Sequence, residues 1–288
     1  MSVDVLQDKI RKKKNPAMLL LGCDPQELPP QYAAGTLAGG FFSCYSELLE
    51  NLKDLIPAVR LSYSDFSLLG PEGLEVLPRL LKLAANLGYY VVLDAPQMLT
   101  PESAKRCAAL LLEEDSPYVF DGLLIPCYLG SDIMKPFLTG CKKQRKELFV
   151  VTRTGNRSAS ELQDLLTGSR LVHMAAADHV NRYVDTPGKH GFSSVGSLAG
   201  ASSAESLRLL RSSYPKLFML LDGFDYPNAN ARNCSFAFDQ FGHGAIACSG
   251  SGITGAWLKE GKGEAFLEEA RAAAERMKKN LNRYLNIL

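Results

Sequence analysis

Eight short apolar segments alternate with helical patterns along the whole chain, and this alternation constrains the fold more than any other feature. The segments are bounded by Gly, Pro, Asp or Ser, as in YYVVLDA at residues 89–95. Short runs of this kind fit parallel strands that are covered on both faces. The expected strands are residues 18–24, 58–64, 89–95, 122–127, 148–154, 193–199, 217–222 and 244–249.

Helical patterns fill the intervals between these segments. Residues 71–87 place their leucines on one apolar stripe, and residues 203–213 open with Ser203 as a helix N-cap. Residues 263–285 combine a charged face with an apolar one. We also expect an extra helix over residues 170–184, between the fifth and sixth strands.

Eight strands and their helices predict one α/β domain, a single (β/α)8 TIM barrel over residues 1–288. No low-complexity linker divides the chain. A doubly wound sheet is the alternative, but it usually carries a Gly-rich turn after its first strand, and here that turn reads Cys23-Asp24-Pro25. In a barrel, the functional site lies at the carboxyl ends of the strands.

Composition excludes several classes of partner. The net charge is +1, so no electrostatic field favours nucleic acid or a membrane surface, and no apolar run reaches the roughly 18 residues of a membrane span. Seven scattered cysteines without a CxxC pair indicate reduced thiols in a cytoplasmic protein. The four histidines lack metal-ligand spacing, so we expect no metal site.

The expected strand ends collect polar residues. Asp94 closes the third strand and has no ionisable neighbour in the next five residues, so it needs a partner from another strand. Arg60 on the second strand is the expected ion-pair partner. We interpret Cys127 and Cys248, which end the fourth and eighth strands, as buried thiols. The strand-end residues are Asp24, Arg60, Asp94, Cys127, residues 153–156 including Asn156, Asp222, Asp225 and residues 249–252.

Several of these stretches resemble orotidine 5′-phosphate decarboxylase, in its longer bacterial form. The resemblance covers nearly the whole chain in order. It rests on LLLGCDP (19–25), PAVRLSYSDFSLLGPEGLEVL (57–77), VVLDA (91–95), YLGSD (128–132), RTGNRSASELQDL (153–165), GFSSVGSLAGA (191–201), AFDQFGHGAI (237–246) and RAAAERMKKNLNRYL (271–285).

The resemblance implies a barrel that forms a homodimer through its strand-end face and acts on pyrimidine nucleotide monophosphates. Such enzymes belong to pyrimidine (UMP) biosynthesis and need neither metal nor organic cofactor. They use a lysine on the second strand and an Asp-x-Lys-x-x-Asp run after the third. An aspartate disfavours the substrate carboxylate, and a lysine protonates the carbanion left by carbon dioxide.

This chain departs from that catalytic pattern. Arg60 stands at the second-strand lysine, and Asp94 at the first aspartate of the run. The proton-donating lysine corresponds to Pro96, and the aspartate that reaches the partner subunit corresponds to Leu99. Proline has no proton to give, leucine has no charge, and a guanidinium is a poor acid.

The ligand-contacting positions depart as well. The phosphate-gripping arginine corresponds to Ser251, the pyrimidine-contacting serine to Gly155, and a loop proline to Asp222. Asp225 adds a second negative charge that would repel a phosphate dianion. Two ribose-contacting positions are retained, as Asp24 and as Ser103 in place of threonine. The candidate ligand contacts are Asp24, Ser103, Asn156, Asp222, Ser249, Ser251 and Gly252.

Three functions remain open from the sequence. The first is a non-catalytic homologue that binds a small molecule, such as a pyrimidine nucleotide, or a partner; the second is new chemistry on the same fold; the third is a retained decarboxylase. A lysine near Asp94 would favour the third, and a deep polar pocket the second. If Met98, Leu99 or Tyr226 fills the mouth, which is the barrel opening at the carboxyl ends of the strands, the non-catalytic homologue is favoured. Scaffold stretches match while substrate positions do not, which favours loss of decarboxylation with Asp94 and Arg60 as the central pair.

Overall fold

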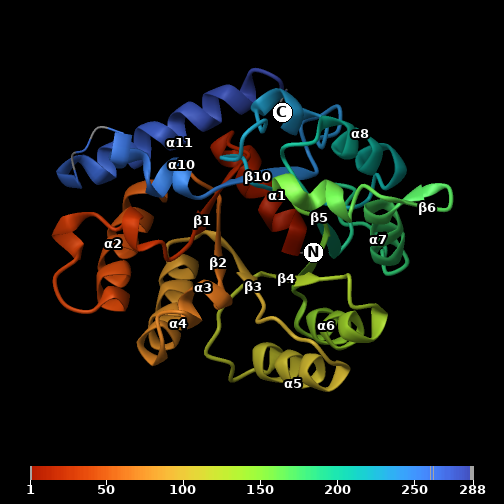
Figure 1. Ribbon diagram of the computed structural model, residues 1–288, viewed down its shortest axis with the longest axis horizontal. Helices are drawn as coiled ribbons and strands as arrows, with labels where there is room; N and C mark the ends of the chain where they lie inside the picture. Colours follow the sequence, from red (N-terminus) through yellow and green to blue (C-terminus); the bar gives the residue numbers. More distant parts are fainter. Residues whose placement is uncertain (1, 260, 262, 286–288) are drawn as a thin grey trace.

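Eight parallel strands close into a barrel in the computed structural model, which describes residues 2–259, 261 and 263–285 (Figure 1). The order around the barrel is β1, β2, β3, β4, β5, β8, β9, β10 and back to β1. The strands are β1 Ala17–Leu21, β2 Ala58–Ser62, β3 Tyr90–Asp94, β4 Gly122–Pro126, β5 Glu147–Arg153, β8 Val195–Gly200, β9 Met219–Asp222 and β10 Ala245–Ser249. Each lies within or beside a segment expected to be a strand, so the predicted (β/α)8 TIM barrel is confirmed.

Helices surround the barrel and cover the outer face of its strands (Figure 1). The predicted helices at 71–87, 203–213 and 263–285 are confirmed as α4, α8 and α11, and the Ser203 hydroxyl caps α8 by accepting from the Ser206 N–H. The α-helices are α1 Ser2–Lys13, α2 Leu37–Leu52, α3 Tyr63–Ser67, α4 Pro71–Asn86, α5 Pro101–Leu112, α6 Ser131–Gln144, α7 Val172–Asn181, α8 Ala204–Ser213, α9 Ala231–Ser235, α10 Ser251–Thr254 and α11 Phe266–Asn282.

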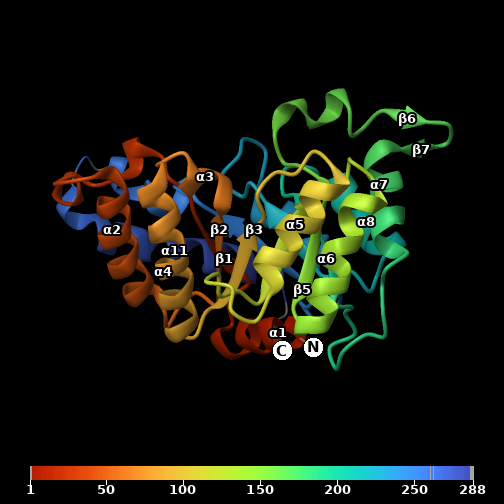
Figure 2. The ribbon, with the colours of Figure 1, turned by 90° about the horizontal axis from the view of Figure 1, so that it is seen from below.

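The connection between β5 and β8 is longer than a simple crossover. The helix expected at 170–184 is present as α7, and it serves as the crossover helix of this unit. The additions before it are a 3-10 turn at Arg157–Glu161 and an antiparallel hairpin of β6 (Leu166–Thr167) and β7 (Arg170–Leu171). Figure 2 shows this hairpin projecting beyond one end of the barrel, at the end opposite α1.

Large apolar side chains fill the barrel interior. Phe149 and Phe218 are fully buried there, with ring centroids 6.4 Å apart in an edge-to-face arrangement. Gly196 on the neighbouring strand makes room for Phe149, since a Cβ at position 196 would lie 2.7 Å from its ring. The interior is therefore a packed core rather than a channel.

Helix α1 closes the amino end of the barrel (Figure 2). Val3, Leu6 and Ile10 pack onto the interior core and are at most 1% exposed. The Val3 N–H donates to Glu147 Oε1 at 2.7 Å, which ties the helix to the start of β5. From the sequence, the basic run at residues 11–14 indicated a solvated helix end, and Arg11, Lys12 and Lys13 form the last turn of α1. Among the described residues, no helix has the length and hydropathy needed to cross a membrane.

Candidate functional site at the barrel mouth

Arg60 is held between two carboxylates at the carboxyl end of the strands. Its Nε and Nη2 donate to Asp94 Oδ1 and Oδ2, both at 2.8 Å, and its Nη1 donates to Asp222 Oδ1 at 2.6 Å. Asp94 pairs in register with Ser62, two residues beyond Arg60, so the arginine side chain extends one layer up the barrel to meet it. The expected Arg60–Asp94 pair is confirmed, and Asp222 joins it from the far side. We call these three residues the Arg60 clamp.

Charge in the clamp is unbalanced. Burial alone would lower the pKa of Arg60, but Asp94 and Asp222 raise that pKa well above its usual value. Burial raises the pKa of Asp94; Arg60 offsets part of this shift, and Asp222 adds to it. One guanidinium faces two carboxylates, so the ionised clamp carries a net negative charge and its cation does not give up a proton.

A hollow of about 360 Å³ opens beside the clamp. Asp24, Glu27 and Asp65 contribute carboxylates to its wall. Burial raises the pKa of Glu27 and of Asp65. Hydrogen bonds partly offset these shifts, from the Thr254 hydroxyl for Glu27 and from the Ser62 hydroxyl for Asp65. Negative charge at this wall disfavours an anionic ligand. The lining residues are Leu20, Gly22, Cys23, Asp24, Glu27, Asp65, Leu68, Gly250, Ser251 and Thr254.

Residues 249–252, at the end of β10, form a turn beside this hollow. Ser251 lines the hollow, whereas Gly252 is exposed and does not line it. Ser249 is buried, and its hydroxyl donates to Asp225 Oδ1 at 2.7 Å. The Gly250 N–H donates to Asp225 Oδ2, also at 2.7 Å. The turn is therefore already engaged by a carboxylate of the chain itself.

Two predicted ligand contacts lie away from the hollow. Ser103 forms a capping box at the start of α5: its Oγ accepts from the Thr100 N–H, and its own N–H donates to Thr100 Oγ1, both at 3.1 Å. Asn156 is exposed in the loop after β5, where its Oδ1 accepts from Thr154 Oγ1 at 2.6 Å. Neither Ser103 nor Asn156 is among the described residues that line the hollow.

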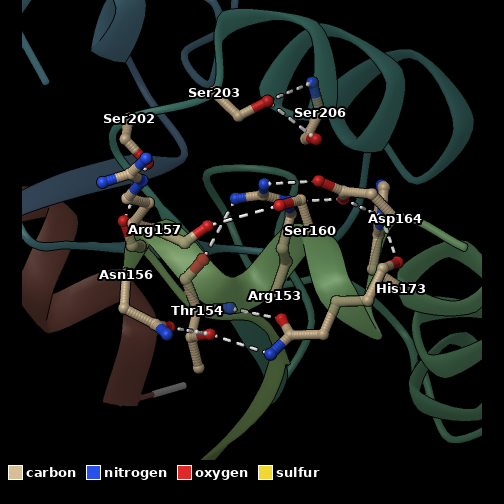
Figure 3. A network of polar contacts seen from close by, with 12 residues as sticks. Arg153, Thr154, Asn156, Arg157, Ser160, Asp164, His173, Ser202, Ser203 and Ser206 are labelled. Atoms are coloured by element: carbon tan, nitrogen blue, oxygen red, sulfur yellow. Dashed lines mark hydrogen bonds and ion pairs between the residues drawn. The ribbon is translucent and has the colours of Figure 1, made fainter. Parts of the chain in front are cut away.

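The loop after β5 is fastened by a polar network (Figure 3). Arg153 donates to both carboxylate oxygens of Asp164, from Nε at 2.9 Å and from Nη2 at 2.8 Å. The buried His173 on α7 lies 3.2 Å from the same carboxylate, and burial lowers its pKa. The Thr154 N–H donates to Gln163 Oε1 at 2.8 Å. Arg153 thus braces its own loop instead of facing the hollow.

The strand-end cysteines are buried thiols, as predicted. Cys127 donates to the Val151 carbonyl at 2.9 Å, and Cys248 lies beneath Arg60 at 1% exposure. Burial raises the pKa of each to about 12, so neither is a thiolate nucleophile near neutral pH. Across the described part of the chain, no three His, Cys, Asp or Glu residues are grouped so as to hold a metal ion.

The three residues considered as fillers of the mouth behave differently. Met98 is buried in the core between barrel and helices, and Leu99 is 81% exposed to solvent. The Tyr226 ring lies across Gly155 and Gly223, since a Cβ at Gly155 would lie 3.1 Å from it. Tyr226 alone of these three covers part of the mouth.

Sequence reasoning missed Glu27 and Asp65 as wall residues of the hollow. Asp65 follows β2 by three residues, and its N–H donates to the Ser62 hydroxyl that caps α3. Its place just after a strand was a usable signal. Glu27 lies three residues after Asp24 in a 3-10 turn, and no pattern in the sequence points it into the mouth.

Comparisons with known proteins agree with this architecture. No family model matches the chain. It is 28% identical over 230 residues to the orotidine 5′-phosphate decarboxylase of Rhodopirellula baltica, covering 78% of this chain and 76% of that protein. It is 24% identical over 287 residues to the orotidine 5′-phosphate decarboxylase of Clostridium novyi, covering 98% of each.

Solved structures give the same fold. The OMP decarboxylase of Leishmania donovani matches with a TM-score of 0.74 at 22% identity, over 98% of each chain. The Methanocaldococcus jannaschii orotidine 5′-monophosphate decarboxylase, solved with the inhibitor BMP, matches with a TM-score of 0.63 at 17% identity, over 91% of this chain and 97% of that one. The class that the fold defines is therefore a (β/α)8 barrel. Over most of its length, the chain is similar to orotidine 5′-phosphate decarboxylases.

Proposed function

We propose that this chain is a decarboxylase-like barrel that has lost decarboxylation and binds a small molecule at its mouth. The Arg60 clamp is the observation that carries the proposal. Every hydrogen bond that the structure gives to the Asp94 carboxylate comes from Arg60, a side chain that stays protonated. Among the described groups that shift the pKa of Asp94, none is a lysine.

Pro96 supports the same conclusion. The resemblance places a proton-donating lysine at this position, and proline has no side-chain proton. Loss of carbon dioxide leaves a carbanion, which needs a positioned proton donor within hydrogen-bond reach. The resemblance also expects a charged residue at 99, and Leu99 is 81% exposed and apolar.

The hollow beside the clamp is the proposed ligand site. Asp24 and Ser251 contribute polar groups from β1 and β10 loops, and the apolar part comes from Leu20 and Leu68. Its carboxylates disfavour a nucleotide phosphate, so the ligand differs in charge from orotidine 5′-phosphate. A panel of nucleosides, nucleotides and amines, read by thermal shift, would identify the charge class because a ligand that binds the native state raises its stability.

Two alternatives have support of their own. Retained decarboxylation is favoured by the relatives, which are named as decarboxylases. New chemistry on the same fold is favoured by the polar hollow, where the raised pKa values of Glu27 and Asp65 suit proton transfer.

Complementation of a pyrimidine-requiring bacterial strain tests the proposal in cells. We expect no growth from this chain at an expression level at which the Clostridium novyi relative restores it. Arg60→Lys, Pro96→Lys, Leu99→Asp and Ser251→Arg together should restore at most a trace, and Pro96→Lys alone should restore nothing. Growth with the unmodified chain would contradict the proposal.

We further propose that the strand-end face forms a homodimer. Loops at this face expose apolar side chains, with Leu68 85%, Leu99 81% and Leu166 72% exposed, after β2, β3 and β5. Covering them would remove apolar surface from water, and an apolar contact at 99 is less costly to bury than a charge. Light scattering should show a dimer at micromolar concentration, and Leu99→Glu should shift it to monomer without loss of helicity. A monomer before substitution would end this proposal.

A further inference from the structure

Asp225 lies flat against the turn that follows β10. Its two carboxylate oxygens accept from the Ser249 hydroxyl and from the Gly250 N–H, each at 2.7 Å. A Cβ at Gly252 would lie only 2.1 Å from Asp225 Oδ1, so the carboxylate touches the turn along residues 249–252. An anion belonging to the chain therefore occupies two donors of this turn, the Ser249 hydroxyl and the Gly250 N–H.

The loop that carries Asp225 is held on both sides. The Phe224 N–H donates to the Cys248 carbonyl at 3.1 Å, which extends the contact between β9 and β10 beyond the strands. Gly223, with φ +70°, turns the chain back, and the Tyr226 ring then packs across Gly155. Anchors before and after position 225 keep its carboxylate on the turn.

The loops after the seventh and eighth strands are where (β/α)8 barrels commonly hold phosphate. A hydroxyl and a backbone N–H are suitable donors for phosphate oxygens. In this chain, the loop after the seventh strand supplies a carboxylate to the donors after the eighth. Phosphate would have to displace Asp225 and then remain beside its charge.

We propose that Asp225 is a specificity-determining residue that excludes phosphorylated ligands from the mouth and restricts it to neutral or cationic ones. This inference rests on the proposed function in that the mouth binds a small molecule. It adds a second reason for the charge preference. Asp225 repels a phosphate anion, and it also occupies the hydrogen-bond donors of Ser249 and Gly250; we call the second effect occupation.

Two substitutions separate occupation from repulsion. Asp225→Ser removes the charge and also vacates the donors of Ser249 and Gly250. Asp225→Asn removes the charge, but its amide oxygen still accepts from the Gly250 N–H. If occupation matters, inorganic phosphate should bind more tightly to the serine variant than to the asparagine variant.

The experiment is calorimetric titration of the full-length protein with inorganic phosphate at low ionic strength. We expect no measurable binding before substitution and, for Asp225→Ser, an affinity at least about ten-fold above the detection limit, because one charge-assisted hydrogen bond corresponds to about that factor. Adding Ser249→Ala to Asp225→Ser should remove most of the gain.

Asp239→Ser is the matched control. The Asp239 carboxylate likewise accepts two hydrogen bonds, here both on Oδ1 and both from backbone N–H groups, of Phe241 at 2.9 Å and His243 at 2.8 Å, in the loop before β10 at the other end of the barrel. This variant should lose comparable local structure without gaining phosphate affinity.

Three results would overturn the inference: phosphate binding before substitution, a folded Asp225→Ser variant with no gain, or an equal gain from Asp239→Ser. Should Asp225→Ser fail to fold, Asp225→Ala carries the same prediction. Equal gains for serine and asparagine would overturn occupation and leave repulsion as the cause. None of these outcomes depends on decarboxylation. The loss of decarboxylation is tested separately, by complementation.

Discussion

The two ends of the barrel bury different kinds of group. At the amino end, α1 covers the opening with Leu6 and Ile10, both fully buried. At the carboxyl end, the side chains that meet are Arg60, Asp94 and Asp222, beside a hollow with three more carboxylates. Apolar packing stabilises one end, whereas the other keeps charge that a purely structural core would not need. In (β/α)8 barrels, the amino end commonly serves stability and the carboxyl end carries the functional site.

Each end also contains a carboxylate with little exposure to solvent, and the two have different hydrogen-bond partners. Glu147 at the amino end accepts one backbone N–H, while its Oε2 has no partner among the described groups. Asp94 at the mouth accepts a bidentate pair of hydrogen bonds from Arg60. Removing the partner at the mouth should therefore cost more than removing any single apolar side chain at the other end.

The largest effect is expected from Arg60→Met. It leaves Asp94 and Asp222 facing each other without a cation, and breaking a buried ion pair in this way costs about 3–5 kcal/mol. Denaturant unfolding at pH 7 measures the loss. Adding Asp94→Leu and Asp222→Leu should recover much of it, because an apolar set of similar size has no uncompensated charge. No loss in Arg60→Met would show that the clamp is solvated instead of buried.

At the amino end, Leu6→Ala should lower the free energy of unfolding by about 2–5 kcal/mol, since it opens a cavity under α1. Val5→Ala on the same helix is the control, because Val5 is 47% exposed and should change stability by less than about 0.5 kcal/mol. Ligand binding at the mouth should be unchanged in both variants below their unfolding temperatures. Equal losses from both would contradict the role of α1 as an apolar plug.

A pH-dependent effect of intermediate size is expected from Glu147. Burial raises its pKa from an ordinary 4.5 to about 8, so the native state holds the proton more tightly than the unfolded chain does. Its contribution to the free energy of unfolding is therefore full below pH 4.5 and is lost as pH rises towards about 8. Glu147→Gln should flatten the stability profile across that interval, as measured by urea unfolding from pH 5 to 9. A parallel profile in the variant would rule out this titration.

The smallest effect is expected at a helix cap at the mouth. Ser203→Ala removes the hydroxyl that accepts from the Ser206 N–H and should destabilise the protein by about 1 kcal/mol. Ser212→Ala near the other end of α8, where the exposed hydroxyl donates to the Leu209 carbonyl, is the control and should be close to neutral. Thermal unfolding resolves the two.

The strands were predictable because a buried parallel strand is a short apolar run whatever its neighbours. The Arg60–Asp94 pair was predictable because the two residues lie on adjacent strands, with Asp94 at the end of β3 and Arg60 two residues before the end of β2. Asp222 in the same clamp is 162 residues from Arg60, and only closure of the barrel brings them together. Only the basic end of helix α1 was expected, because its apolar stripe of Val3, Leu6 and Ile10 is set among charged residues. Loop conformation likewise decides how Glu27 and Asp225 point, and no periodic pattern encodes it.

Release of carbon dioxide from orotidine 5′-phosphate by the purified, unmodified protein is the most direct test of the central claim. On our proposal, Arg60 and Pro96 take the places of the lysines and cannot protonate the carbanion, so we predict release no faster than the uncatalysed background. The assay needs an active relative as positive control and Asp94→Ala as negative control. Turnover that survives repurification and disappears in Asp94→Ala would contradict the account, because it would show that the clamp opens to perform the reaction.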